Sequence, residues 1–161
     1  LKEDVAKYGM YNAYRHAIAP TGSISYVNDA TASLLPIVNK IEERQEGMIG
    51  KVYYPAPGLS NETMPYYVSA YDTDMRRVID VYAAAQEHID QGMALTLFMR
   101  STLPEHLYEW KNNRTNKMTT RDLTILRNYA FNKGIKSLYY VRTFTDDNQE
   151  SGVNECESCS I

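Results

Sequence analysis

The chain has 161 residues, of which 43% are hydrophobic and 23% are charged, and its formal net charge is −3. This size and balance are typical of one globular domain, exclude a largely disordered chain, and give no electrostatic reason to expect nucleic acid as a partner. No apolar run is long enough to cross a bilayer, and the N-terminal stretch LKEDVAKYGM lacks the order of a signal peptide, so we expect a cytoplasmic protein without a membrane partner.

The first half of the chain is expected to be largely irregular. A short amphipathic helix begins near the N-terminus, where Val5 and Tyr8 recur at helical spacing. Pro20 disfavours a helix at the residue before it, and a loop of small residues follows. From residue 27 to about residue 72, turn-forming residues and prolines dominate, so we interpret this stretch as a connector with one short helix near residues 35–44.

A long helix is predicted next. Asp72 or Thr73 is a suitable N-cap for a helix that starts near Asp74, and Gly92 is a suitable residue to end it. The apolar face of this helix is expected to consist of Val78, Val81, Tyr82, Ala85 and Ile89. Residues 94–99 then form an apolar run typical of a buried strand.

The remaining elements continue the alternation. A short helix is predicted over residues 103–110, and a longer one is capped by Thr119 or Thr120 and ended by Gly134. The apolar face of this longer helix is expected to consist of Leu123, Leu126 and Ala130, flanked by Ile125 and Tyr129. Residues 136–144 are predicted to form a second strand. Helices and strands that alternate in this way indicate an α/β protein with parallel strands and right-handed crossovers.

The loop at residues 20–25 is the first candidate site. Its residues are Pro20, Thr21, Gly22, Ser23, Ile24 and Ser25. A small, hydroxyl-rich turn that leads into a helix can aim several backbone N–H groups at one point and form a cradle for phosphate. No lysine stands beside it, so it is not a P-loop, and an ordinary capped turn is the alternative.

Adjacent Tyr139 and Tyr140 form the second candidate site. The chain holds 14 tyrosines against 3 phenylalanines, a bias that suits half-buried surfaces and interfaces. Two phenols close together could pass an electron and a proton, whereas consecutive residues of a regular strand point to opposite faces. A functional pair therefore predicts a bend, a bulge or a strand end here, and simple packing is the alternative.

The third candidate is the C-x-x-C formed by Cys156 and Cys159, the only cysteines of the sequence. In the cytosol such a pair is more often a working dithiol or half a metal site than a structural disulfide. The three histidines are scattered, so we expect no metal site. No apolar face follows residue 145, which predicts a mobile tail. A flexible dithiol arm and an incidental pair of thiols both remain possible at this point.

The order of these motifs resembles one family. IAPTGSIS, LYYVRTF and the terminal CESC follow one another as in the C-terminal part of the large, catalytic subunit of class I ribonucleotide reductase. The stretches NDATASLLPIVNKIEERQ, DQGMALTLF, TTRDLTILRNYAFNKGIKSLYYVRTF and NECESC are most similar to the class Ib form. The resemblance covers essentially the whole chain.

The resemblance implies a reaction and a role for each motif. Ribonucleoside diphosphates would be reduced to 2′-deoxyribonucleoside diphosphates by a radical mechanism that supplies DNA precursors. The loop at residues 20–25 would hold the substrate diphosphate, Tyr139 and Tyr140 would transfer the radical, and Cys156 and Cys159 would shuttle reducing equivalents. The chain would bind no cofactor itself, because the radical comes from a metal-containing small subunit and the electrons from a thioredoxin- or glutaredoxin-like reductant.

The resemblance also implies a fold and missing parts. Residues 1–145 would be the C-terminal portion of a ten-stranded α/β barrel, and residues 146–161 a flexible redox-active tail. The radical cysteine of the family lies upstream, and the chain begins at Leu1, so we expect a fragment that is inactive without the N-terminal remainder of the large subunit. The small subunit, a redoxin and the nucleoside diphosphate are the other implied partners. A small dithiol carrier or accessory binding module is the alternative.

Overall fold

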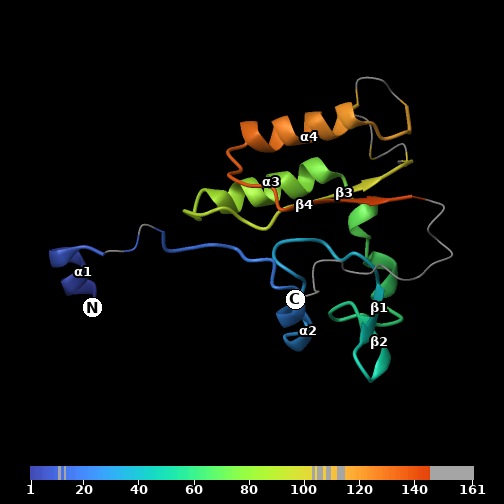
Figure 1. The fold of residues 1–161 in the computed structure, drawn as a ribbon, viewed down its shortest axis with the longest axis horizontal. Coiled ribbons are helices and arrows are strands. Elements are labelled where there is room, and N and C mark those ends of the chain that lie inside the picture. Colours follow the sequence, from blue (N-terminus) through green and yellow to red (C-terminus); the bar gives the residue numbers. More distant parts are fainter. Residues whose placement is uncertain are drawn as a thin grey trace.

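The computed structural model describes residues 1–10, 12, 14–102, 104, 107, 110, 111 and 115–145. Its helices and strands follow the chain as α1 (Lys2–Tyr8), α2 (Gly22–Val27), β1 (Ile41–Glu46), β2 (Gly50–Pro55), the 3-10 helices η1 (Met64–Tyr66) and η2 (Ala70–Asp72), α3 (Met75–Gln86), β3 (Thr96–Arg100), α4 (Thr120–Asn132) and β4 (Tyr140–Phe144). α1 lies at one end of the molecule, away from the other elements, and none of its residues is buried (Figure 1).

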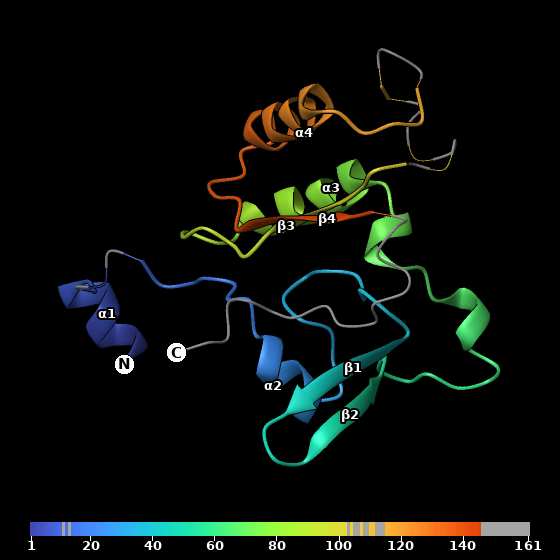
Figure 2. The same ribbon diagram turned by 45° about the vertical axis from the view of Figure 1, so that its right-hand side comes forward.

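The core is an α/β unit built by the second half of the chain. β3 and β4 pair in parallel, with Thr96 opposite Tyr140, and α3 and α4 run side by side next to this two-stranded sheet (Figures 1 and 2). The largest fully buried side chains are Tyr82, Ile79, Leu95, Leu97, Leu126 and Asp122. The predicted alternation of helices and parallel strands is therefore confirmed.

The details of α3 correct three predictions. Its N-cap is Asp74, whose carboxylate accepts a hydrogen bond from the Arg76 N–H at 2.9 Å, rather than Asp72 or Thr73. The Asp72 carboxylate instead pairs with Arg100 of β3. Val81 was expected on the apolar face, yet it is 56% exposed, because the buried stripe runs through Val78, Ile79 and Tyr82. The helix also ends at Gln86, before Gly92.

α4 begins and ends as the sequence predicts. Thr119 is its N-cap in a capping box, in which the Thr119 hydroxyl accepts from the Asp122 N–H and the Asp122 carboxylate accepts from the Thr119 N–H. Leu126 and Ala130 are buried, as expected for the predicted face. Gly134, with φ of +81°, follows the last turn and donates its N–H to the Phe131 carbonyl.

The predicted helix near residues 35–44 is wrong, because an antiparallel hairpin of β1 and β2 begins there. Glu43 lies opposite Tyr53, and its carboxylate lies 2.6 Å from the ammonium of Lys51. Gly47 and Gly50, with φ of +44° and +90°, supply the backbone conformations that the turn requires. Cross-strand pairs and this turn stabilise the hairpin where no helical repeat of apolar residues competes.

Two predicted elements concern residues that the structure does not describe. They are most of the short helix predicted over residues 103–110 and all of the tail at residues 146–161. Within the described ranges, no helix combines the length and the apolar character that crossing a membrane would require.

Candidate functional site

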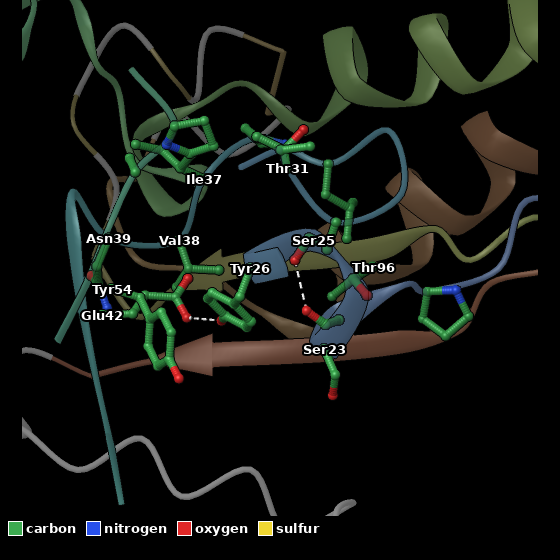
Figure 3. A pocket seen from close by; sticks show the side chains of 18 of the residues that line it. Ser23, Ser25, Tyr26, Thr31, Ile37, Val38, Asn39, Glu42, Tyr54 and Thr96 are labelled. Atoms are coloured by element: carbon green, nitrogen blue, oxygen red, sulfur yellow. Dashed lines mark hydrogen bonds between the residues drawn. The ribbon is translucent and has the colours of Figure 1, made fainter. Parts of the chain in front are cut away.

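A pocket of about 440 Å³ lies where five segments of the chain meet (Figure 3). The segments are the loop and helix α2, the stretch of residues 29–39, the β1–β2 hairpin, the start of β3 and the start of β4. Residues that line the pocket from these segments include Pro20, Ser23, Ser25, Tyr26, Glu42, Arg44, Tyr54, Thr96, Tyr139, Tyr140 and Arg142. Two of the three candidate sites found in the sequence therefore share one pocket, although more than a hundred residues separate them.

The loop at residues 20–25 leads directly into α2, which begins at Gly22, as predicted. Pro20, Gly22, Ser23 and Ser25 line the pocket, whereas Thr21 and Ile24 do not line it. Ser25 is buried, and its hydroxyl donates a hydrogen bond of 2.6 Å to the Gly22 carbonyl. Ser23 is exposed.

The first backbone amides of α2 have no acceptor within the helix, which is one requirement of an anion cradle. The first helical hydrogen bond runs from the Ser25 N–H to the Thr21 carbonyl at 3.0 Å, so the amides of residues 22–24 precede it and have no acceptor within the helix. None of these three amides belongs to either of the described sheets. Amides at this end of a helix attract negative charge.

A hydrogen-bond network fixes the loop from the side of the core. Thr21 and Ser33 both adopt left-handed backbone conformations, with φ of +44° and +55°, and the Thr21 hydroxyl accepts from the Ser33 N–H at 2.9 Å. The Ser33 hydroxyl lies 2.9 Å from the hydroxyl of Tyr82, which is fully buried and donates to the Ala94 carbonyl at 3.0 Å. Left-handed conformations of such residues persist only where neighbouring contacts enforce them.

Tyr139 and Tyr140 contact each other, as the sequence analysis predicted for a functional pair. Their ring centroids lie 4.1 Å apart, and the ring planes are inclined by 53°. β4 begins at Tyr140, whereas Tyr139 precedes the strand and donates its N–H to the Leu95 carbonyl at 2.8 Å. The strict alternation of a strand therefore does not apply between these two residues.

A polar and aromatic cluster in the pocket was not anticipated from the sequence. The Tyr26 hydroxyl donates to the Glu42 carboxylate, and its ring lies 4.5 Å from the Tyr54 ring between centroids (Figure 3). The guanidinium carbon of Arg44 lies 4.3 Å from the Tyr26 ring centroid and its Nε lies 3.9 Å from the Glu42 carboxylate. Glu42 and Arg44 are two residues apart on β1, so they lie on the same face of the strand. The sequence would have indicated this shared face if residues 41–46 had been predicted to form a strand.

The electrostatics of this cluster favour a neutral phenol at Tyr26. Burial raises the pKa of Tyr26 well above its ordinary value, and the hydrogen bond to the Glu42 carboxylate raises it further. The phenol therefore stays protonated at physiological pH and remains a hydrogen-bond donor. The described residues include no group of three or more His, Cys, Asp or Glu side chains that could hold a metal ion.

The third candidate site, Cys156 and Cys159, lies outside the described residues.

Comparisons with known proteins agree on one family. Residues 1–141 match the model of the ribonucleotide reductase barrel domain. The chain is 49% identical over its full length to the ribonucleoside-diphosphate reductase NrdEB subunit alpha of Bacillus subtilis, 46% identical to another ribonucleoside-diphosphate reductase subunit alpha of that organism, and 41% identical to the subunit alpha of Mycoplasma genitalium. It spans only 13%, 20% and 21% of the lengths of these relatives.

Proposed function

The chain belongs to the ribonucleotide reductase barrel-domain family, and from this premise we propose that it works as the C-terminal part of a catalytic subunit that reduces ribonucleoside diphosphates to 2′-deoxyribonucleoside diphosphates. The observation that carries the proposal is the shared pocket, which the start of α2 and the Tyr139–Tyr140 pair both line. A phosphate cradle and a pair of redox-capable phenols in one cavity suit a radical reaction on a nucleotide.

In this proposal the substrate diphosphate binds at the start of α2. The amides of Gly22 and Ser23, which both line the pocket, would donate to the phosphate oxygens, and the Ser23 side chain would add a hydroxyl donor. Charge-assisted hydrogen bonds of this kind are stronger than neutral ones, so a few of them can fix the position of a charged substrate. Arg44 and Arg142 also line the pocket and favour an anion within it.

Tyr139 and Tyr140 are proposed to carry the radical. Each phenol would lose an electron and a proton to an oxidised neighbour and regain both when the next group is oxidised in turn. A centroid separation of 4.1 Å allows direct transfer between the two rings. The initial oxidising equivalent would come from the metal-containing small subunit, and the end of the path would be a cysteine in the upstream part of the large subunit.

Cys156 and Cys159 are proposed to restore the reduced state. Reduction of one nucleotide removes the 2′-hydroxyl as water and converts two thiols of the upstream part into a disulfide. A Cys156 or Cys159 thiolate would attack that disulfide, and exchange would return the two thiols and leave a Cys156–Cys159 disulfide. A thioredoxin- or glutaredoxin-like protein would then reduce this disulfide.

This scheme requires more than the present segment. The sequence contains two cysteines, both assigned to the shuttle, so the radical cysteine and its reducing partners must come from the N-terminal remainder of the large subunit. A small dithiol carrier, the alternative function, would need neither the pocket nor the tyrosine pair.

A substitution at Gly22 tests the binding of the diphosphate. In the complete enzyme, this segment joined with the upstream part of the large subunit, Gly22→Pro removes one donor N–H from the cradle and also disfavours the conformation of Thr21 before it. We expect the KM for a nucleoside diphosphate to rise about ten- to a hundredfold, because a hydrogen bond to a charged group contributes about 1.5–3 kcal/mol.

Gly22→Ala is the matched control. Its added Cβ would meet no atom within 4 Å, and the amide donor is retained. The KM of this variant should stay close to that of the parent enzyme. If Gly22→Pro and Gly22→Ala have the same KM, the start of α2 does not bind the diphosphate.

A further inference from the structure

We infer that Tyr26 is a positioning residue, through which the β1–β2 hairpin holds α2 and its substrate loop in the geometry that binds a nucleoside diphosphate. The inference rests on the proposed function and goes beyond it, because it assigns a role to the hairpin and to a side chain that need not contact the substrate. It concerns the arrangement of the pocket walls rather than the radical chemistry.

Tyr26 makes the principal side-chain link between α2 and the hairpin. Its hydroxyl donates to the Glu42 carboxylate of β1, and its ring packs against Tyr54 of β2 with 4.5 Å between centroids. The Arg44 guanidinium lies 4.3 Å from the centroid of the same ring. Both strands of the hairpin thus contact one side chain of the helix, which Figure 3 shows for Glu42 and Tyr54.

The position of α2 depends on few other contacts. The helix has six residues, and only Ser25 among them is buried. Its first turn is fixed by the bond between the Thr21 hydroxyl and the Ser33 N–H, at the end opposite to Tyr26. A helix of this length spans about 9 Å, so Tyr26 lies about one turn from Gly22 and Ser23, and its contacts hold the end of α2 that the Thr21–Ser33 bond does not.

The charges around Tyr26 are compatible with an anionic substrate in the same pocket. Glu42 lines the pocket and would repel a diphosphate if its carboxylate were unpartnered. The Tyr26 hydroxyl and the Arg44 guanidinium, whose Nε lies 3.9 Å from the Glu42 carboxylate, both engage this group. The contacts around Tyr26 therefore orient α2 and also partly neutralise Glu42, which lines the pocket together with a second acidic residue, Asp29.

The test is Tyr26→Phe in the complete enzyme. Phenylalanine keeps the ring contacts and removes the hydrogen bond to Glu42. A poorly positioned loop weakens the binding of the substrate and of the transition state equally. We therefore expect the KM for a nucleoside diphosphate to rise about three- to tenfold, with kcat unchanged. Tyr53→Phe is the matched control, since Tyr53 interacts with Glu43 on the same hairpin, is 60% exposed and does not line the pocket.

Substitutions of the acceptor supply a second measurement. Glu42→Ala removes the same hydrogen bond from the other side, together with a negative charge that opposes an anionic substrate. Glu42→Gln removes the same charge but retains an acceptor oxygen, so the KM of Glu42→Ala should exceed that of Glu42→Gln about three- to tenfold. In the double variant, Tyr26→Phe with Glu42→Ala, the two effects should not multiply, because one interaction is lost only once.

The outcomes separate this inference from the proposed function. Equal KM values for Tyr26→Phe and Tyr53→Phe overturn the positioning role, as does a fall in kcat at unchanged KM or a full multiplication of effects in the double variant. If Gly22→Pro raises the KM while Tyr26→Phe does not, only the inference fails. If Gly22→Pro leaves the KM unchanged, the start of α2 does not bind the diphosphate, and the proposed binding mode fails together with the positioning role.

Discussion

At the scale of single residues, Tyr139 and Tyr140 show how a strand end creates a pair. Tyr140 is the first residue of β4, and Tyr139 lies just outside it, so their rings meet at 4.1 Å instead of pointing apart. From the sequence alone, contact between the two rings could be stated only as a requirement for a functional pair. Nothing in LYYVRTF fixes the residue at which the strand begins. The start is fixed by pairing with β3, where Thr96 lies opposite Tyr140.

Replacing either tyrosine of the pair tests radical transfer. In the complete enzyme, Tyr139→Phe and Tyr140→Phe each keep the aromatic ring but remove the phenolic proton that must leave when the residue is oxidised. We expect turnover to be abolished and the affinity for a nucleoside diphosphate to be unchanged, as measured by equilibrium binding. Tyr66→Phe, at an 83% exposed position outside the pocket, is the control. Turnover by both pair variants would remove Tyr139 and Tyr140 from the radical path.

At the scale of elements, periodicity and caps predicted the second half of the chain well and the first half poorly. α3 and α4 lie close to their predicted places because their buried residues recur at helical spacing and Thr119 caps α4. β3 corresponds to a continuous apolar run that is buried, whereas β4 has no buried residue and occupies the second half of its predicted range, residues 136–144. The sequence did not predict the hairpin, because the charged residues of IEERQE are distributed over both faces of the strand. Its stability comes from cross-strand partners, such as Lys51 opposite Gln45 and beside Glu43, that only the register reveals.

The capping box of α4 should make the start of this helix sensitive to acid. Burial raises the pKa of Asp122, but hydrogen bonds from Thr119 and Lys111 outweigh it and hold the pKa below its ordinary value. A carboxylate with a lowered pKa stabilises the folded state above its ordinary pKa, and this contribution is lost as the pH falls through the lower, folded-state value. The start of α4 should therefore loosen below about pH 4.

Thr119→Ala tests this cap. We expect the variant to lose about 1 kcal/mol of local stability at neutral pH, and its difference from the parent should shrink in acid, where protonated Asp122 no longer supports the box. Hydrogen exchange at the Leu123 amide, which donates to the Thr119 carbonyl at 3.2 Å, reports the opening of the first turn. Thr120→Ala, at the next and exposed position, should change this exchange little. Equal exchange in the two variants would contradict a stabilising box.

At the scale of the whole molecule, the pocket is a product of tertiary structure. The loop at residues 20–25 and the tyrosine pair stand out in the sequence because their composition is unusual, and their resemblance to one family indicated that they act together. Tyr26, Glu42 and Arg44 gave no such signal, since their contact requires the hairpin to fold back on α2. Residue types that carry chemistry can be found in the sequence, whereas the side chains that position them become evident only after packing.

Re-reduction of the complete enzyme after each turnover is the role proposed for Cys156 and Cys159. Replacing Cys156 and Cys159 together by serine removes the only thiols of this segment and changes none of the described residues that line the pocket. Turnover supported by a redoxin should vanish, because no dithiol remains to carry electrons from the redoxin to the disulfide of the upstream part. A first turnover from prereduced enzyme should survive, and so should slow turnover with a small dithiol that diffuses into the site.

Ser158→Ala, which lies between the two cysteines and keeps both thiols, is the matched control and should support normal turnover with the redoxin. The measurement is product formed per enzyme, first without any reductant and then with the redoxin or the small dithiol. Loss of the first turnover in the double variant would mean that the two serines disturb catalysis itself. Normal turnover of the double variant with the redoxin would show that Cys156 and Cys159 do not shuttle electrons.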